Sequence, residues 1–330
     1  MDTLIETKEL KTYFPVQTEN GHQIVKAVDG VSLTVCSGET VGLVGESGCG
    51  KSTLGRTILG LAKRTSGQIW FQGQRIDTLS DSAMKPFRKE MQIIFQDPFA
   101  ALNPRKSIFD LVKAPLDAFH EGSASERKER VRKMLDFVGI GDYQYDKYPH
   151  ELSGGQRQRV VIARAMILKP KFVVCDEAVS ALDVSIRAQV LNLMKDLQKE
   201  TGVAYLFISH DMSVVHYLCD RIAVMYLGRI VEEGTKKDIF DYPCHPYTRA
   251  LLSAIPRPEV GAHRQRILLK GDVPSPLAVP KGCRFHTRCP FATAACATME
   301  TPLCDIGSGH CAACPVMEQP FKERSQTACI

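Results

Sequence analysis

The chain has 330 residues, more than one average domain, so a main domain with an appendage is expected. Its 42 basic and 37 acidic residues give a net charge of +5, and 44% of the residues are hydrophobic. These values are typical of a globular protein and exclude extended disorder, and a charge of +5 over this length gives no basis for nucleic-acid binding. No apolar run approaches the roughly 18 residues that span a bilayer, and the first residues lack a secretory pattern, so we expect a cytosolic chain.

Three short runs, at residues 40–44, 172–175 and 203–208, predict buried strands of an α/β sheet. Each run is apolar and rich in β-branched or aromatic residues. Between the last two runs, apolar residues recur at helical spacing: Ile186, Val190, Leu193, Met194 and Leu197. Gly202 follows as a stop signal, so we expect a crossover helix there.

Residues 125–133 alternate acidic and basic side chains. Because acids interrupt the bases, this run predicts a solvated helix face rather than a nucleic-acid patch.

The composition changes near residue 255, where we place a domain boundary. Prolines that break regular structure follow this point: Pro256, Pro258, Pro274, Pro276 and Pro280. Seven of the twelve cysteines then fall in the last fifty residues: Cys283, Cys289, Cys296, Cys304, Cys311, Cys314 and Cys329. In a reducing compartment such a cluster indicates metal or iron–sulfur ligation more than a disulfide framework.

A glycine-rich segment follows the first predicted strand: Gly45-Glu46-Ser47-Gly48-Cys49-Gly50-Lys51-Ser52-Thr53. It fits the phosphate-loop pattern in full, and a helical pattern continues to Leu59. Glycines in such a loop let backbone N–H groups converge on a phosphate at the helix N-terminus. Lys51 is expected to reach the β- and γ-phosphate oxygens and Ser52 to ligate Mg²⁺, so this segment predicts a nucleotide site.

The second predicted strand ends in two carboxylates, Asp176 and Glu177. Adjacent acids at a strand end are often only solvated. With a phosphate loop upstream, however, we expect Asp176 beside the metal and Glu177 one residue further out, where it can polarise water.

Two further segments complete a pattern that resembles the ATP-binding cassette (ABC) superfamily. Ser153-Gly154-Gly155-Gln156 resembles the signature motif, and Ser180-Ala181-Leu182-Asp183 resembles the D-loop with its aspartate Asp183. The resemblance implies that Gln96 is the Q-loop glutamine and a further Mg²⁺ ligand, and that His210 is the switch histidine. It also implies the fold: a RecA-like α/β P-loop NTPase core with an antiparallel β-subdomain and a helical subdomain at about residues 97–165, within a cassette spanning residues 1–255.

The signature also makes physical sense as a second anion site, because Ser153 and the Gly154 and Gly155 amides open a predicted helix. The resemblance implies a head-to-tail dimer in which each ATP lies between one subunit's phosphate loop and the other's signature. Near the start of the chain, Phe14 matches the aromatic residue that stacks on adenine. Tyr13 is the neighbouring alternative, and a packing role in the core is the other.

Beyond the cassette, the chain resembles the ATPases of dipeptide and oligopeptide importers. The segments that carry this resemblance are Cys244-His245-Pro246-Tyr247-Thr248, Gly271-Asp272-Val273-Pro274 and Gly282-Cys283-Arg284-Phe285-His286. The resemblance covers about residues 5–316 and is closer to the F-type than to the D-type subunit. One departure is Ala178, where most cassettes carry proline.

In this extension, residues 256–330, four cysteines match the family positions associated with a [4Fe–4S] cluster: Cys283, Cys289, Cys296 and Cys314. Four thiolates are the ligand set that such a cluster needs. Zinc on the same thiolates and uncoordinated buried thiols stay as alternatives, and the additional cysteines leave Cys314 the least secure ligand.

The resemblance therefore implies the ATP-hydrolysing subunit of an importer of di- or oligopeptides, using ATP and Mg²⁺ at the cytoplasmic face of the inner (plasma) membrane. Its implied partners are a paralogous D-type ATPase, two transmembrane permeases and an external substrate-binding protein, with no nucleic acid. Alternatives are import of nickel, glutathione or cationic peptides. A soluble ABC ATPase acting on DNA or ribosomes is disfavoured, because the sequence contains no second cassette, and an iron–sulfur protein with a degenerate cassette is disfavoured, because every ATP-site residue is present.

Overall fold

The computed structural model describes residues 2–19, 21–255 and 267–314. Pro256, Pro258 and Cys329 lie outside these residues. The chain divides into two compact units. The first comprises Met1–Glu6, Thr34–Thr40 and Trp70–Ile208, and the second comprises Thr7–Leu33, Val41–Ile69 and Ser209–Ile330.

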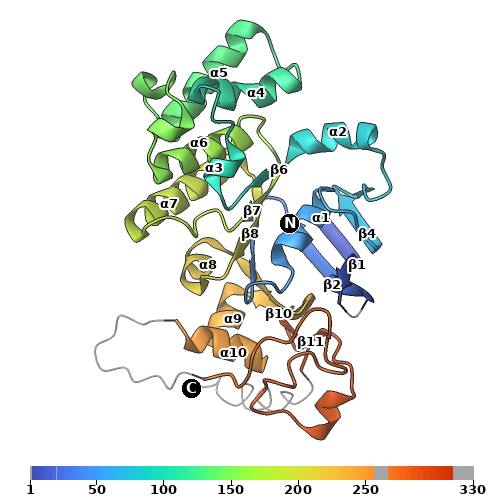
Figure 1. Ribbon diagram of the computed structural model, residues 1–330. Helices are drawn as coiled ribbons and strands as arrows, with labels where there is room; N and C mark the ends of the chain where they lie inside the picture. The colour runs from blue at the N-terminus through green and yellow to red at the C-terminus, as the bar shows by residue number, and fades with distance from the viewer. Residues whose placement is uncertain (1, 20, 256–266, 315–330) are drawn as a thin grey trace, which may run out of the picture. The chain divides into compact units, whose positions relative to one another are not determined.

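The first unit contains three parallel strands in the order β8-β7-β6 (Figure 1). These are β6 (Met91–Ile94), β7 (Phe172–Asp176) and β8 (Ala204–Ser209). Every residue of β7 is buried, as expected for a central parallel strand covered on both faces. The second and third strands predicted from the sequence are therefore confirmed.

Helices make up most of the rest of the first unit: α2 (Asp81–Glu90), α3 (Pro98–Ala101), α4 (Ile108–Ala118), α5 (Ala124–Phe137), α6 (Gly154–Met166) and α7 (Val184–Thr201), with short 3₁₀ turns at Asp142–Gln144 and Pro149–Glu151. Helix α4 packs against α5 and α6, and α6 packs against β6 and α7. Helix α7 confirms the predicted crossover helix, and it ends at Gly202 in the left-handed conformation (φ 69°). On α5, Lys128 and Glu129 are exposed while Val131 and Leu135 are buried, so this helix has the expected solvated face.

The main sheet of the second unit has the order β11-β12-β10-β9-β3. Its strands are β3 (Thr40–Val44), β9 (Arg221–Tyr226), β10 (Arg229–Thr235), β11 (Cys304–Asp305) and β12 (Cys311–Ala312). Strand β3 pairs in parallel with β9, and the other pairs are antiparallel. The cysteine-rich extension thus adds two short strands to the sheet that carries the predicted phosphate loop, which the sequence did not indicate.

A second sheet has the strand order β2-β1-β4-β5. Strand β1 (Thr3–Thr18) lies between β2 (Gly21–Cys36) and β4 (Ser66–Phe71), and most residues of these three strands belong to the second unit. In the first unit, β5 (Gln74–Arg75) pairs antiparallel with the end of β4. The helices in the described residues of the second unit are α1 (Lys51–Ile58), α8 (Met212–Leu218), α9 (Lys236–Asp241), α10 (Pro246–Ser253) and the 3₁₀ turn Ala294–Ala297. Among the described helices, none is both long and apolar enough to cross a membrane.

Candidate active site

The predicted phosphate loop connects β3 to α1 through residues 45–50. Gly45 (φ 155°) and Gly50 (φ 106°) have backbone conformations that side chains rarely adopt. A Cβ atom on Gly45 would lie 2.2 Å from the carbonyl oxygen of Met225, and one on Gly50 would lie 2.0 Å from that of Ala27. Both positions therefore require glycine, and the loop keeps its shape because neighbouring backbone packs directly against it.

Lys51 is the first residue of α1 and is only 5% exposed. Its ammonium group donates to the carbonyl oxygens of Gly45 (2.8 Å) and Glu46 (2.9 Å). Gly50, the N-cap of α1, provides no side-chain hydrogen bond, and the N-terminus of a helix suits an anion. Burial raises the pKa of the Cys49 thiol, which keeps this loop cysteine protonated.

Glu46 is held by two side chains of the second unit that lie far along the sequence. Its backbone N–H donates to the Tyr247 hydroxyl at 2.8 Å. Its carboxylate receives a two-pronged pair from Arg288, with Nη1–Oε2 at 2.7 Å and Nη2–Oε1 at 3.1 Å. Such forked pairs fix orientation as well as charge, so the extension is anchored on the loop.

The same extension segment is anchored near the predicted adenine-side aromatics. The Arg284 guanidinium donates to the Asp29 carboxylate and to the Leu227 carbonyl oxygen, and the Tyr13 hydroxyl donates to the other Asp29 oxygen. Burial opposes ionisation of Asp29, but the hydrogen bonds from Tyr13 and Arg284 lower its pKa overall. Burial and the bond to Asp29 raise the pKa of Tyr13 to about 12. Because the Tyr13 hydroxyl is engaged there while the Phe14 ring is 39% exposed, Phe14 is better suited to stack on a base.

The structure brings Gln96 and Glu177 together in the first unit. Gln96 Nε2 donates to Glu177 Oε2 at 3.0 Å, although the two residues are 81 positions apart. Asp176 is the buried last residue of β7, and Glu177 follows it with a left-handed backbone (φ 49°). Its N–H donates to the Ile208 carbonyl oxygen at 3.1 Å, which ties this unusual conformation to β8.

The signature segment begins α6, with Ser153 as its N-cap. The Ser153 hydroxyl accepts from the Gln156 N–H at 3.3 Å, and the Gln156 side chain accepts from the Ser153 N–H at 3.0 Å, which forms a capping box. A hydroxyl that accepts in this way keeps its own proton to donate. Ser153 and Gly154 are exposed, whereas Gly155 is buried against Ile186, so this helix start is open to a ligand on one side.

The remaining predicted residues lie at the starts of two other helices. Asp183 is the N-cap of α7 and accepts from the Ile186 N–H at 3.0 Å. His210 is exposed in the short connection between β8 and α8, in the second unit. Asp211, directly after it, caps α8.

The four predicted cluster cysteines all lie in the described part of the second unit. The Cys283 N–H donates to the Cys296 carbonyl oxygen at 2.9 Å. Burial raises the pKa of Cys283 and of Cys289, and the neighbouring Cys296 raises both further. Cys314 follows β12, and the described cysteines form no disulfide. Among the described residues, these four thiols do not form a group whose ligand atoms all lie within 4.8 Å of one another.

A buried carboxylate, Glu232 on β10, joins two parts of the second unit. It is 0% exposed and accepts from the N–H groups of Cys244 (2.7 Å) and His245 (2.9 Å) and from His310 Nε2 (2.8 Å). Glu232, Cys244 and His310 also lie close enough to hold a cation. Because both carboxylate oxygens already accept hydrogen bonds, this group acts as a structural link.

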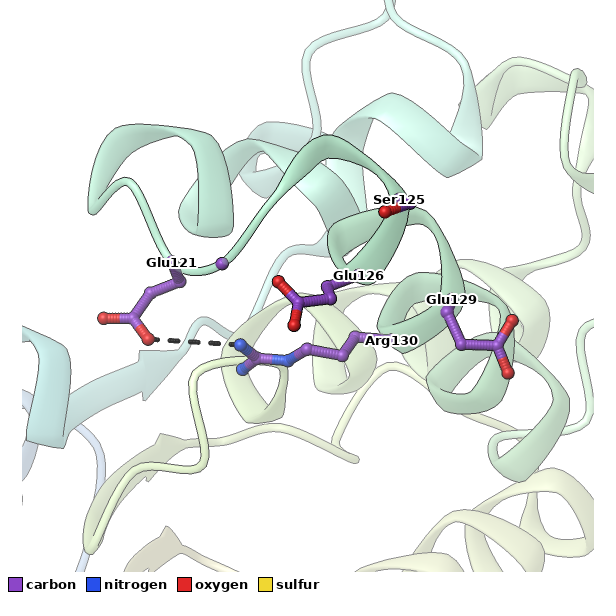
Figure 2. Close-up of a pocket in the computed structure, with 6 residues that line it drawn as sticks. Glu121, Ser125, Glu126, Glu129 and Arg130 are labelled. Atoms are coloured by element: carbon purple, nitrogen blue, oxygen red, sulfur yellow. Dashed lines mark ion pairs between the residues drawn. The ribbon is translucent and has the colours of Figure 1, made fainter.

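A surface hollow of about 720 Å³ lies beside the start of α5, away from the ATP motifs in sequence (Figure 2). It is lined by Glu121, Gly122, Ser125, Glu126, Glu129 and Arg130. Arg130 approaches the Glu121 carboxylate at 4.0 Å. Three carboxylates against one guanidinium repel a triphosphate, so this hollow is not part of the candidate site.

Four residues around the nucleotide loop were missed by the sequence analysis: Asp29, Tyr247, Arg284 and Arg288. Tyr247, Arg284 and Arg288 stand in or next to segments that carry the resemblance, and both arginines lie between Cys283 and Cys289. Their position in or next to these segments was the signal that could have identified them. It could not indicate which loop the side chains contact, since the contacts span 242 positions for Arg288 and 255 for Arg284.

Comparison with known proteins gives two family matches and several close relatives. Residues 28–180 match the ABC transporter family, and residues 231–296 match the C-terminal region of oligopeptide/dipeptide transporters. The chain is 50% identical over 319 residues to the oligopeptide transport ATP-binding protein AppF of Bacillus subtilis, covering 95% of this chain and 97% of that protein. It is 48% identical to the dipeptide transport ATP-binding protein DppF of Escherichia coli, over 96% of this chain and 95% of that one. Among solved structures, the dimeric ATP-binding cassette MJ0796 bound to ADP and Pi is similar with a TM-score of 0.64 and 28% identity, covering 71% of this chain and 99% of that one.

Proposed function

Because the chain belongs to the ABC transporter family of ATP-binding proteins, with the C-terminal region of the oligopeptide/dipeptide transporters, we propose that it hydrolyses ATP to power the import of di- or oligopeptides. The observation that carries this proposal is an intact phosphate loop, with Lys51 buried at its base, in a chain half identical over almost its whole length to a peptide-transport ATPase. The names of AppF and DppF support peptides as the solute.

Each ATP-site residue has a proposed task. The phosphate loop, Gly45 to Thr53, binds the phosphates, with Lys51 neutralising their charge. Ser52, Asp176 and Gln96 are the residues that would hold Mg²⁺, a hard cation that prefers their hydroxyl, carboxylate and amide oxygens. When bound, Mg²⁺ supplies positive charge opposite the β- and γ-phosphate oxygens.

Glu177 is the proposed general base. It accepts a hydrogen bond from Gln96, which orients its carboxylate and leaves it able to polarise a water molecule. His210 is proposed to stabilise the transferring group, and Phe14 to stack on adenine. Phosphoryl transfer needs mainly positioning of the reacting groups and stabilisation of their charge. The side chains assigned here can supply both, although they come from several elements.

The signature is proposed to act on the ATP of a second ATPase, a paralogous D-type subunit in a heterodimer. Ser153 supports this role because it is exposed, caps α6 and keeps a proton that it can donate to a phosphate. The similarity to a dimeric cassette supports a dimer of this kind. Asp183 of the D-loop would lie at the same dimer interface.

The assembly proposed for this subunit includes two transmembrane permeases and an external substrate-binding protein. We place the subunit on the cytoplasmic face of the plasma membrane, since ATP is available there and the permeases span the bilayer. Gln96 would report the nucleotide state to the surface that meets the permeases.

Cys283, Cys289, Cys296 and Cys314 are proposed to hold a [4Fe–4S] cluster. Four thiols are the ligand set that such a cluster needs, and the hydrogen bond from the Cys283 N–H to the Cys296 carbonyl oxygen supports a shared position for two of these residues. The cluster would crosslink the extension, residues 256–330, whose described part has little regular structure and buries little apolar surface of its own. Zinc on the same thiolates is the alternative that the donor set also fits.

The proposed function is tested with Glu177→Gln and Lys51→Ala in the assembled transporter. Glu177→Gln should retain ATP binding and slow hydrolysis by roughly 10²–10⁴-fold, because it removes the base but not the phosphate contacts. Lys51→Ala should weaken ATP binding itself. Glu200→Gln, an exposed carboxylate on α7, is the matched control and should hydrolyse ATP normally. Turnover of Glu177→Gln within a few-fold of the wild type would refute the assignment.

A further inference from the structure

The Glu46 residue of the phosphate loop has all three of its polar groups engaged. Its N–H donates to the Tyr247 hydroxyl, its carbonyl oxygen accepts from Lys51 Nζ, and its carboxylate pairs with Arg288. Two of these three partners come from outside the cassette motifs. The third, Lys51, is the residue on which phosphate binding is proposed to depend.

Tyr247 is fixed by packing rather than by its hydroxyl alone. It is fully buried, and its ring lies 4.7 Å from that of Tyr226 and 5.4 Å from that of Phe285, between centroids. His245 accepts a hydrogen bond from the Tyr247 N–H at 3.1 Å, which fixes the start of α10 as well. The hydroxyl oxygen that receives the Glu46 N–H therefore has little freedom to move.

Arg288 is equally constrained. Its side chain is 8% exposed, and four residues earlier Arg284 is anchored by Asp29 and Leu227. Phe285, between the two arginines, is buried against Tyr226 and Tyr247. The residues that precede Arg288 are thus fixed by hydrogen bonds and by ring packing, so its forked pair can impose an orientation on Glu46.

We propose that Tyr247 and Arg288 are positioning residues for ATP binding: they hold Glu46 so that the phosphate loop keeps its binding shape. This inference deepens the proposed function and rests on it. The Glu46 N–H donates to the Tyr247 hydroxyl, so this N–H group holds the loop in its shape. The Glu46 carbonyl oxygen in turn accepts from Lys51 Nζ and positions that side chain. Contacts that fix a loop before the ligand arrives raise affinity, because less ordering accompanies binding.

The consequence is that ATP affinity depends on the extension. Arg284 and Arg288 lie within the segment from Cys283 to Cys289, whose two ends are proposed cluster ligands. Loosening this segment should lower ATP affinity through Glu46, although none of its residues is proposed to touch ATP.

The test compares Tyr247→Phe, Arg288→Gln and Glu46→Gln with the wild type. ATP binding is measured on the full-length chain, and KM and kcat are measured in the assembled transporter. Tyr247→Phe keeps the packed ring and removes only the acceptor, so we expect about a tenfold rise in the Kd and KM for ATP, the loss for one hydrogen bond, with kcat within twofold. Arg288→Gln should give a similar rise. In the double variant Glu46→Gln with Arg288→Gln, the second substitution should raise the Kd for ATP by less than a further twofold, because the two residues share one interaction.

Matched controls separate positioning from general destabilisation. Tyr205→Phe removes a buried hydroxyl that bonds to Met194, and Arg75→Gln breaks the forked pair of Arg75 with Asp77, both within the first unit. Tyr205→Phe should lower the unfolding midpoint about as much as Tyr247→Phe does, and both controls should leave KM unchanged.

Three outcomes would overturn one of the proposals, and they can be told apart. If Tyr247→Phe and Arg288→Gln bind ATP as the wild type does while Lys51→Ala does not bind it, the positioning role is wrong and the proposed function stands. If Lys51→Ala also binds ATP normally, the proposed ATP site itself is wrong. A rise in KM that the control variants share equally would likewise refute positioning.

Discussion

The Glu232 carboxylate should be one of the most costly single side chains to remove from the second unit. Replacing it with alanine leaves three buried donors without their acceptor: the N–H groups of Cys244 and His245, and His310 Nε2. An unsatisfied buried donor costs about 1–3 kcal/mol, and water entering the vacated space recovers part of this. We therefore expect Glu232→Ala to lower the free energy of unfolding by about 4 kcal/mol.

The loss should also be local, because Glu232 ties β10 to the segment that leads into α10. Amide hydrogen exchange at Cys244 and His245 reports it directly, since both amides lose their acceptor. A change of about 4 kcal/mol corresponds to roughly a 10³-fold faster exchange when these amides open with the unit. Urea unfolding of the full chain, followed by fluorescence and circular dichroism, gives the global value.

Asp272→Ala serves as the control, since Asp272 is an exposed carboxylate in the same unit. It should change the unfolding free energy by less than about 0.5 kcal/mol. The reasoning would be refuted if Glu232→Ala unfolded at the same urea concentration as this control and kept full protection at Cys244 and His245.

Three other side chains, His245, Cys289 and Ser153, give separate expectations. Burial lowers the pKa of His245 from 6.5 to about 4, so the unfolded chain binds the proton first. The contribution of neutral His245 to the free energy of unfolding should thus be retained above pH 6.5 and fall by about 3 kcal/mol as the pH drops to 4. In urea titrations at several pH values, His245→Asn should show a smaller fall. Anaerobically isolated protein should be brown and contain about four irons per chain. Cys289→Ser should lose the colour and the iron, and Cys304→Ser should keep them. Metal-free wild-type protein would contradict the cluster. Ser153→Arg should impair hydrolysis at the partner's phosphate loop and Ser125→Arg should not, and an active transporter with two copies of this chain and no second ATPase would contradict the heterodimer.

Local sequence patterns predicted the regular elements because each pattern reflects a short-range constraint. The apolar run at residues 172–175 became β7, which is buried throughout, and helical spacing with a terminal Gly202 became α7. The phosphate loop was recognisable for the same reason, since Gly45 and Gly50 meet a requirement of the backbone at their own positions.

The contacts of the extension could not be predicted in this way. Strands β11 and β12 have two residues each, too few to show alternation, and they form only because β10 offers an edge with which to pair. Similarly, nothing in the sequence around Arg288 indicates that its partner is Glu46, 242 positions away.

The amino-acid sequence by itself therefore determined the ATPase class and the residues of its phosphate loop, because backbone geometry and phosphate chemistry restrict which residues can occupy such a loop. It also determined that the cysteines gather in the extension. Only the tertiary structure decided that Gln96 bonds to Glu177, and that Tyr247 and Arg288 hold Glu46. Pairings of this kind depend on how distant segments pack, and many sequence separations are compatible with the same local pattern.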